Sequence, residues 1–261
     1  MLIDINANTG HWPFNKTNCN TCAELLKRMD KYGVDMSVVS NMNGIFYKNT
    51  QPANEELYDE LKSDRRFRKR FVPFGIINPI YAGWRHDFDI CINNFGMKGI
   101  RLYPLYHDYE LTDPNLFELI NLAKEKGIVV AFTLRMVDSR CRFWMDLNKE
   151  HSLRDFIPVI RTVPDAKYFI LNIANGIQLN QEDTDTVRES KVLFDTSGRN
   201  IGHMASMIKK YGSSVFAFGT HSPILDYLTG LLRIESLRPD EADSNAMESM
   251  RWANAARMLE L

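Results

Sequence analysis

Hydrophobic and polar positions alternate along the whole chain on two length scales. Short apolar runs, which suit buried strands, are separated by longer stretches whose apolar residues recur at helical spacing. Eight such runs occur, and polar side chains or a turn signal follow each of them. The run from Ile128 to Leu134 is apolar almost throughout, as expected of a strand that is covered on both faces. The predicted strands cover residues 2–5, 34–40, 71–77, 99–102, 128–134, 168–171, 192–194 and 215–218.

The stretches between these runs carry the start and stop signals of helices. Thr21 and Glu24 form a capping-box pattern at the start of the first stretch, and Gly33 follows its end. Asp113 and Pro114 open a later helix with a cap and a proline in the first turn. The predicted helices cover residues 22–32, 54–62, 84–95, 114–126, 152–160, 183–190, 201–211, 223–232 and 243–259.

Strands that alternate with helices in this way form either a closed barrel or an open, doubly wound sheet. The count of eight strands and the lack of a glycine-rich nucleotide loop favour the barrel. No linker rich in Pro, Gly or Ser interrupts the pattern. We therefore predict one α/β domain, a (β/α)8 TIM barrel that covers residues 1–261, with the last helix packed outside it.

Composition argues against several classes of partner. The net charge is −1, and Lys and Arg are spread along the chain, so we expect no nucleic-acid partner. No apolar run approaches the ~18–20 residues that a membrane span needs, so we expect no membrane partner. The first residues lack a signal-peptide pattern, and four cysteines indicate no disulfide framework, so a cytoplasmic location is expected.

Cys19 and Cys22 form a CxxC pair, which raises the question of a structural zinc site. Such a site needs a second pair of ligands, and Cys91 and Cys141 each stand alone in the sequence. The residues around the pair also lack the context of a redox dithiol. We interpret the two cysteines as part of the start of the first helix.

The most informative stretch is residues 1–14, where a short buried strand leads directly into a polar cluster. Asn6, Asn8, Thr9 and His11 follow one another there. A barrel of this kind carries its functional side chains at the C-terminal ends of its strands. These side chains are therefore candidates for a site in the barrel mouth.

Several motifs carry a resemblance to a known family. The first strand is similar to the pattern Ile-Asp-x-His-x-His, with Asn6 and Asn8 in the two histidine positions. Residues 96–104 (GMKGIRLYP), 194–197 (FDTS), 218–223 (FGTHSP) and 254–259 (NAARML) are similar to further motifs of that family. The chain thus resembles the amidohydrolase superfamily, in the branch of metal-dependent hydrolases and aromatic-acid decarboxylases. The resemblance implies a distorted (β/α)8 barrel with an extra C-terminal helix, and a homodimer.

The resemblance also implies where a metal ion would bind. The family holds its metal with the histidines of the first strand, histidines after the fifth and often the sixth strand, and an aspartate after the eighth. Neutral amides and a hydroxyl are poor ligands for zinc, so we expect no metal. A relocated zinc site held by His11, His221 and Asp195 is the alternative. The positions of this chain that match the family's metal ligands are Asn6, Asn8, Thr133, Asn172 or Ile173, and His221.

The same residues suggest a metal-independent acid–base site. His221 would titrate near neutrality as the general acid or base, and Asp195 would orient it and raise its pKa. Arg101 and Arg135 would clamp a substrate carboxylate. His11 is a further catalytic candidate. The remaining candidates for substrate contact are Asn6, Asn8, Tyr103, Thr133 and Asn172.

Each charged candidate also has a purely structural explanation. Arg135 could pair with Asp138, three residues further on. Arg101 could pair with an acid of the barrel rim, and Asp195 could cap the turn that follows its strand.

Two functions remain open at this point. The site suits a hydrolase, lactonase or decarboxylase that acts on a small anionic carboxylate metabolite. Alternatively, loss of the metal ligands leaves a catalytically inactive barrel that binds a small ligand or has a structural role. A water-filled pocket with His221 and Asp195 hydrogen-bonded and both arginines pointing inward favours the enzyme, whereas a mouth plugged by side chains such as Trp12 or Phe14 favours the binding or structural protein.

Overall fold

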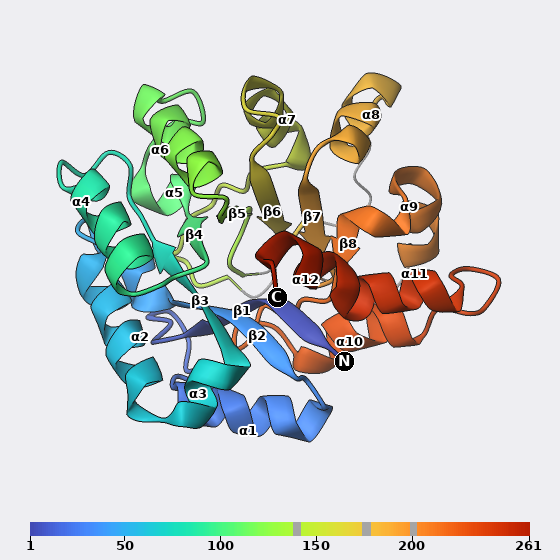
Figure 1. Ribbon diagram of the computed structural model, residues 1–261, viewed down its shortest axis with the longest axis horizontal. Helices are drawn as coiled ribbons and strands as arrows, with labels where there is room; N and C mark the ends of the chain where they lie inside the picture. Colours follow the sequence, from blue (N-terminus) through green and yellow to red (C-terminus); the bar gives the residue numbers. More distant parts are fainter. Residues whose placement is uncertain (138–141, 174–178, 199–202) are drawn as a thin grey trace.

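The computed structural model describes residues 1–137, 142–173, 179–198 and 203–261 of the chain. Its eight strands run parallel, and each pairs with the next in sequence order. Backbone hydrogen bonds from Ile5 N to Phe218 O (2.9 Å) and from Asn8 N to Ser222 O (2.8 Å) join the first strand to the eighth. The sheet is a nearly closed barrel surrounded by helices (Figure 1), which confirms the predicted TIM-barrel fold. The strands are β1 (Ile3–Thr9), β2 (Met36–Asn41), β3 (Phe71–Ile76), β4 (Gly99–Leu102), β5 (Val129–Thr133), β6 (Lys167–Leu171), β7 (Val192–Asp195) and β8 (Phe216–Ala217).

The α-helices lie between the strands and on the outside of the barrel. Several begin at a side-chain cap that the sequence predicts: Thr21 and Glu24 form the capping box of α1, and Asp113 caps α6. The described helices are α1 (Cys22–Tyr32), α2 (Gln51–Ser63), α3 (Arg65–Arg70), α4 (Trp84–Asp89), α5 (Pro104–His107), α6 (Pro114–Glu125), α7 (Leu153–Thr162), α8 (Gln181–Glu189), α9 (Met204–Tyr211), α10 (Tyr227–Glu235), α11 (Ser244–Glu248) and α12 (Asn254–Leu259).

Several helices differ from their predicted form: α5 was not predicted, α2 begins at Gln51 rather than at 54, and a π-helix, Ser249–Ala253, divides the predicted helix 243–259. α3 was not predicted, because Phe67 is its one buried residue and the rest of it is charged. α10 begins at Tyr227 rather than at 223, because Asp226 supplies its cap. The predicted helix 84–95 continues past α4 as a π-helix, Ile90–Asn94. The first residues of the predicted helix 201–211 lie outside the described part of the chain.

Two apolar layers hold the barrel together. Alternate side chains of the strands fill its interior, such as Ile5, Phe74 and Phe169, while their neighbours face outward and pack against the helices. Met258 and Leu259 of α12 pack against the interior layer. α12 therefore lies across one end of the barrel (Figure 1), which confirms the extra C-terminal helix.

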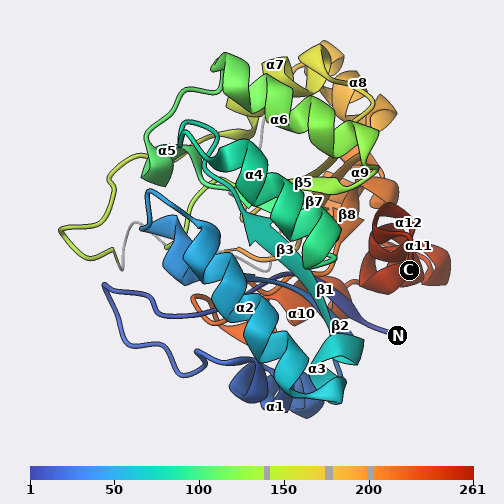
Figure 2. The same cartoon turned by 60° about the vertical axis from the view of Figure 1, so that its left-hand side comes forward.

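The loops at the other end of the barrel, where the strands end, are long. Figure 2 shows that the loops between β1 and α1 and between β5 and α7 both project from one side of the molecule. Phe14 of the first loop stacks on Phe143 of the second, with 6.0 Å between the ring centroids. The two loops therefore contact each other over the C-terminal ends of the strands.

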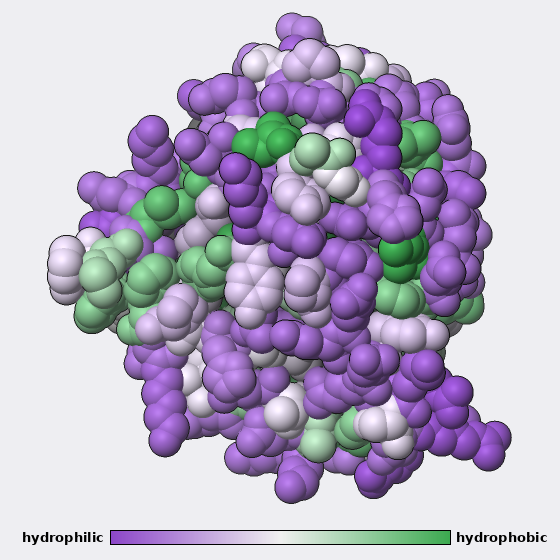
Figure 3. Space-filling view, turned by 90° about the vertical axis from the view of Figure 1, so that its left-hand side faces the viewer, coloured by the Kyte–Doolittle hydropathy of each residue, from purple (hydrophilic) through white to green (hydrophobic). Residues whose placement is uncertain are grey.

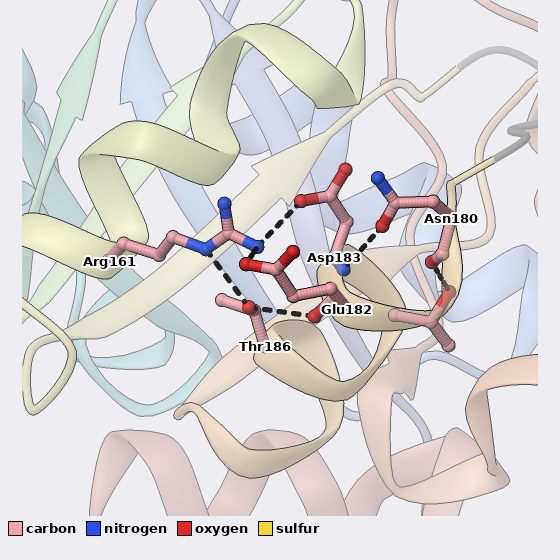
Figure 4. Close-up of polar contacts among 6 residues, drawn as sticks. Arg161, Asn180, Glu182, Asp183 and Thr186 are labelled. Carbon is pink, nitrogen blue, oxygen red and sulfur yellow. Dashed lines mark hydrogen bonds and ion pairs between the residues drawn. The ribbon is translucent and has the colours of Figure 1, made fainter.

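Polar contacts on the outside join neighbouring helices. Arg161 of α7 donates to Asp183 (2.8 Å) and Thr186 (3.3 Å) of α8 and forms an ion pair with Glu182 (2.9 Å), as Figure 4 shows. Asn180 caps α8 by accepting from the backbone N of Asp183 (2.8 Å). These groups are partly exposed, so each pair contributes at most about 1 kcal/mol.

The structure also bears on the predictions for the cysteine pair and for a membrane partner. Cys19 and Cys22 are buried free thiols at the start of α1, as the helix-start interpretation requires. Within the described ranges, no helix is long and apolar enough to cross a membrane. The homodimer stays a prediction.

Candidate functional site

Arg101 lies at the centre of the barrel and is 1% exposed. From β4, its Nε donates to Thr133 Oγ1 on β5 (3.1 Å). Its Nη1 donates to Ala7 O (3.1 Å) and Asn8 Oδ1 (2.8 Å) on β1, and its Nη2 donates to Oδ1 of Asn6. The guanidinium therefore spans the barrel interior, since β1 and β4 are separated by two strands.

All four of these acceptors are uncharged oxygens. Taking a cation out of water costs several kcal/mol, whereas each hydrogen bond from a charged donor returns about 1.5–3 kcal/mol. Four of the five N–H donors of a guanidinium are used here. The hydrogen bonds of Arg101 thus compensate for its desolvation. Arg101 therefore does not need to pair with an acid of the barrel rim, which was the structural explanation considered for it.

Asn6 connects Arg101 to a buried carboxylate. Its Oδ1 accepts from Arg101, and its Nδ2 donates to Asp195 Oδ2 (2.6 Å) at the end of β7. Asp195 also accepts from the backbone N of Asn172 (2.7 Å). Burial raises the pKa of Asp195, and the hydrogen bonds from Asn6 and Asn172 act against that shift. Asp195 and His221 therefore both lie against Asn6 and do not pair directly as predicted.

His221 follows β8 and is fully buried. Its Nε2 lies 2.8 Å from Met136 O, and its Nδ1 lies 3.2 Å from Asn6 Oδ1. Burial lowers the pKa of His221 to about 3, and the positive charge of Arg101 adds to this shift. The ring is neutral at pH 7, and the shorter contact assigns its proton to Nε2, which donates to Met136 O. The expectation that His221 titrates near neutrality is thus wrong, because burial and Arg101 disfavour the imidazolium.

A pocket of about 320 Å³ opens at the C-terminal ends of β4 and β5. Tyr103 and Thr133 line it from the barrel, and the loop between β5 and α7 supplies most of its other walls. Neither His221 nor Asp195 lines it, but Met136, which contacts His221, does. The charged side chains that line the pocket are Arg135, Arg142, Lys149, Asp146 and Glu150.

Two buried donors of this pocket lack hydrogen bonds. The side chain of Arg135 is 4% exposed, and its Nη1 lies 3.9 Å from Oε2 of Glu150, too far for a hydrogen bond. Its Nε donates weakly to Asn172 Oδ1 (3.4 Å). The Tyr103 hydroxyl is also buried, and its contact with Thr133 lacks the geometry of a full hydrogen bond. Unsatisfied buried donors cost about 1–3 kcal/mol each, so they mark a place where a ligand can bind.

The structure separates the predicted residues into two groups. Tyr103, Thr133 and Arg135 line the pocket. The second group lies within the barrel or behind the pocket wall and comprises Asn6, Asn8, Arg101, Asn172, Asp195 and His221.

His11 belongs to neither group, because its side chain is exposed in the loop after β1. In the described ranges, no three His, Cys, Asp or Glu side chains gather closely enough to hold a metal ion. The relocated site of His11, His221 and Asp195 is therefore not assembled. Asp138, the partner considered for Arg135, and Cys141 lie outside the described residues.

Sequence reasoning missed the pocket residues of the loop between β5 and α7. Asp146 accepts from the hydroxyl of Tyr106 (3.0 Å), which ties this loop to α5. Lys149 and Glu150 line the pocket beside Arg135. The available signal was loop length, because nineteen residues separate Thr133 from Leu153, and long loops in compact domains are often functional.

Aromatic side chains cover the part of the mouth next to this pocket. Trp12 is buried between Phe14 and Phe46, with centroid distances of 5.4 and 5.3 Å, and packs in the same apolar cluster as Met136. Figure 3 shows apolar side chains gathered on a projection at the left edge of a largely hydrophilic face. The mouth thus combines a polar pocket with an aromatic cover, and His221 and Asp195 are not hydrogen-bonded to each other, although the enzyme criterion required this.

Solved structures with this fold match over the full chain. A 2,6-dihydroxybenzoate decarboxylase from Rhizobium is 12% identical, with a TM-score of 0.73, over 99% of this chain and 98% of that chain. A dihydroxybenzoic acid decarboxylase from Polaromonas, solved with manganese and the inhibitor 2-nitroresorcinol, is 10% identical, with a TM-score of 0.73, over 100% and 97%. An amidohydrolase II is 14% identical, with a TM-score of 0.75, over 100% of both chains.

These matches show that the chain shares the TIM-barrel fold of these proteins over its full length. No family model matches the sequence, and neither does any curated protein.

The residues of this barrel do not fit a divalent metal of the kind that the fold family implies. The side-chain oxygens of Asn6, Asn8 and Thr133 already accept hydrogen bonds from Arg101. A divalent ion placed among them would meet a positive guanidinium, and the nearest described carboxylate, Asp195, already accepts hydrogen bonds from Asn6, Ser197 and the backbone of Asn172. We therefore derive no chemical step through a metal.

Proposed function

We propose that the mouth pocket binds a small anionic carboxylate, and that the protein acts on it as a hydrolase or a carbon–carbon lyase. The observation that supports this most directly is Arg135, a buried cation in the pocket wall with a hydrogen-bond donor left over. A carboxylate accepts from a guanidinium with two oxygens and would satisfy this donor.

The charge and lining of the pocket support the same ligand class. Three basic side chains line it against two acids, and one of those acids, Asp146, is held by Tyr106. Tyr103 and Tyr106 add aromatic surface beside the charged groups. An aromatic carboxylate would use both features. Two matching structures are decarboxylases named for dihydroxybenzoates, which agrees with this substrate class.

We assign roles to the residues by their place. Arg135 binds the carboxylate, and the Tyr103 hydroxyl donates to the substrate. Glu150 lies beside Arg135 in the pocket and is our candidate for proton transfer, since water reaches it. His221 and Asp195 support the site from behind the pocket wall, because Met136 separates His221 from the pocket and Asn6 binds Asp195.

Equilibrium binding tests the proposal. In calorimetric titrations with a panel of carboxylates that includes 2,6-dihydroxybenzoate, at least one should bind ten-fold or more tightly than its uncharged counterpart, here resorcinol. Arg135→Met should remove this preference, because the charge that pairs with the carboxylate is gone. Arg161→Met, a change in an exposed arginine far from the pocket lining, is the matched control and should keep it. Carbon dioxide release from bound benzoates then separates a lyase from a hydrolase.

Equal binding of charged and uncharged ligands by the unaltered protein would contradict the proposal, as would a preference that survives Arg135→Met.

A second candidate function is a barrel that binds its ligand without chemistry. The burial of His221 at 0% exposure and the aromatic cover around Trp12 favour it, because they remove the best acid–base group from the pocket. Tight carboxylate binding without turnover of any panel member would select this function over the enzyme.

A further inference from the structure

The surroundings of Arg101 point to a role that none of the comparisons assigns to it. The guanidinium is 1% exposed and makes hydrogen bonds to side chains of β1 and β5 from its own position on β4. Its acceptors surround it much as ligands surround an ion. Among these contacts, the Ala7 carbonyl at 3.1 Å comes from the backbone between the two asparagines.

Three of these acceptors are the positions at which the family resemblance places metal ligands. Asn6 and Asn8 stand at the two histidine positions of the first strand, and Thr133 stands at that of the fifth. All three side-chain oxygens point to one guanidinium. Asn6, Asn8 and Thr133, which stand at the ligand positions, therefore act as hydrogen-bond acceptors for the Arg101 guanidinium.

The charges are matched as well. A guanidinium carries one positive charge and needs hydrogen-bond acceptors, which neutral amide and hydroxyl oxygens supply. A divalent ion needs stronger ligands and is repelled by a cation nearby. The buried carboxylate nearest in the network, Asp195, reaches Arg101 only through Asn6. A single positive charge thus occupies the centre of the barrel.

We propose that the Arg101 guanidinium is the resident cation of this barrel, held by Asn6, Asn8 and Thr133, and that it excludes a divalent metal from their oxygens. The positive charge beneath the mouth then comes from the Arg101 side chain rather than from a bound metal ion. Tyr103, which lines the pocket, lies over this guanidinium with 5.9 Å between the ring centroid and Cζ. This inference concerns the same site as the proposed function but does not depend on which ligand binds there.

Metal titration of the unaltered protein is the first test. Calorimetry with Zn²⁺ and with Mn²⁺ measures how many metal ions each protein binds. The unaltered protein and Asn8→Ala should bind the same number of ions, because no metal ion binds at Asn8. Any binding that Asn8→Ala leaves unchanged belongs to other groups and agrees with the proposal. One bound equivalent that disappears in Asn8→Ala would overturn it, and this test needs no redesigned site.

A redesigned site tests the exclusion directly. Asn6→His, Asn8→His and Thr133→His are combined in one protein, which is prepared with Arg101 and with Arg101→Met. The protein with Arg101→Met should bind one Zn²⁺ at least 100-fold more tightly than the one with Arg101. Adding Arg135→Met instead is the matched control and should not improve binding, since Arg135 does not contact these positions.

Equal zinc affinity with and without Arg101 would overturn the proposal, provided that circular dichroism shows both proteins folded. If either does not fold, the titration of the unaltered protein decides. Both readouts are independent of activity, so failure of the proposed function leaves this inference standing, and the reverse also holds.

Discussion

At the scale of single residues, Arg101 determines the properties of its neighbours. It orients the amides of Asn6 and Asn8, and through its charge it helps to keep His221 neutral. A histidine in the barrel mouth would otherwise be the natural acid–base group. We therefore expect the properties of this mouth to depend more on the buried Arg101 than on His221.

Acid should destabilise the protein through His221. The unfolded ring takes up a proton near pH 6.5, whereas the folded ring does so only near pH 3. Stability from the neutral ring is present above pH 6.5 and is lost as the pH falls, by about 2 kcal/mol between pH 6.5 and 4.5. Urea unfolding should show this loss relative to His221→Gln, with the exposed His11→Gln as the matched control for losing an imidazole.

The same pH profile for the unaltered protein and for His221→Gln would show that His221 is already charged in the folded state.

The sequence predicted which residues gather at this site better than it predicted their partners. Asn6, Thr133 and Arg101 follow neighbouring or facing strands, so the barrel brings them together. Whether Asp195 reaches His221 or Asn6 depends on side-chain geometry of a few ångströms. No periodicity in the sequence carries that information, and the predicted Asp195–His221 pair was wrong for this reason.

At the scale of elements, strands and capped helices were predictable where local signals were strong. β4 and α1 have the predicted bounds, since Gly99 and Thr21 mark their starts. α3 was missed because its charged residues show no apolar face around Phe67. The pocket wall between β5 and α7 was missed because its described residues, 142–152, form no helix or strand that a sequence pattern would indicate.

Helix α10 holds the ends of β7 and β8 in place through a close backbone contact. A Cβ on Gly230 would lie 2.2 Å from the backbone oxygen of Gly219, which cannot move away cheaply. Gly230→Ala should therefore reduce the free energy of unfolding by about 3 kcal/mol, although such a change usually stabilises a helix by ~1 kcal/mol. Thermal and urea unfolding measure the change. Leu232→Ala, at a 40% exposed position of α10, is the control and should cost less.

A Gly230→Ala protein as stable as the unaltered one would show that α10 can shift away from the loop after β8.

At the scale of the whole molecule, the alternating pattern predicted a single barrel because eight strand–helix units have few other arrangements. The fold places all strand ends on one side, so the residues at the motifs had to meet there. In this barrel the oxygens of Asn6, Asn8 and Thr133 accept from Arg101, whereas the matching structure from Polaromonas was solved with manganese. A shared barrel thus does not establish a shared mechanism.

The most direct test of the whole account is a crystal structure grown with manganese and 2,6-dihydroxybenzoate, with data collected for anomalous scattering. The account predicts the carboxylate on Arg135 in the pocket and the Arg101 guanidinium between Asn6, Asn8 and Thr133, with no anomalous peak there. An anomalous peak among those three oxygens, with Arg101 displaced and the carboxylate bound to the ion, would contradict it.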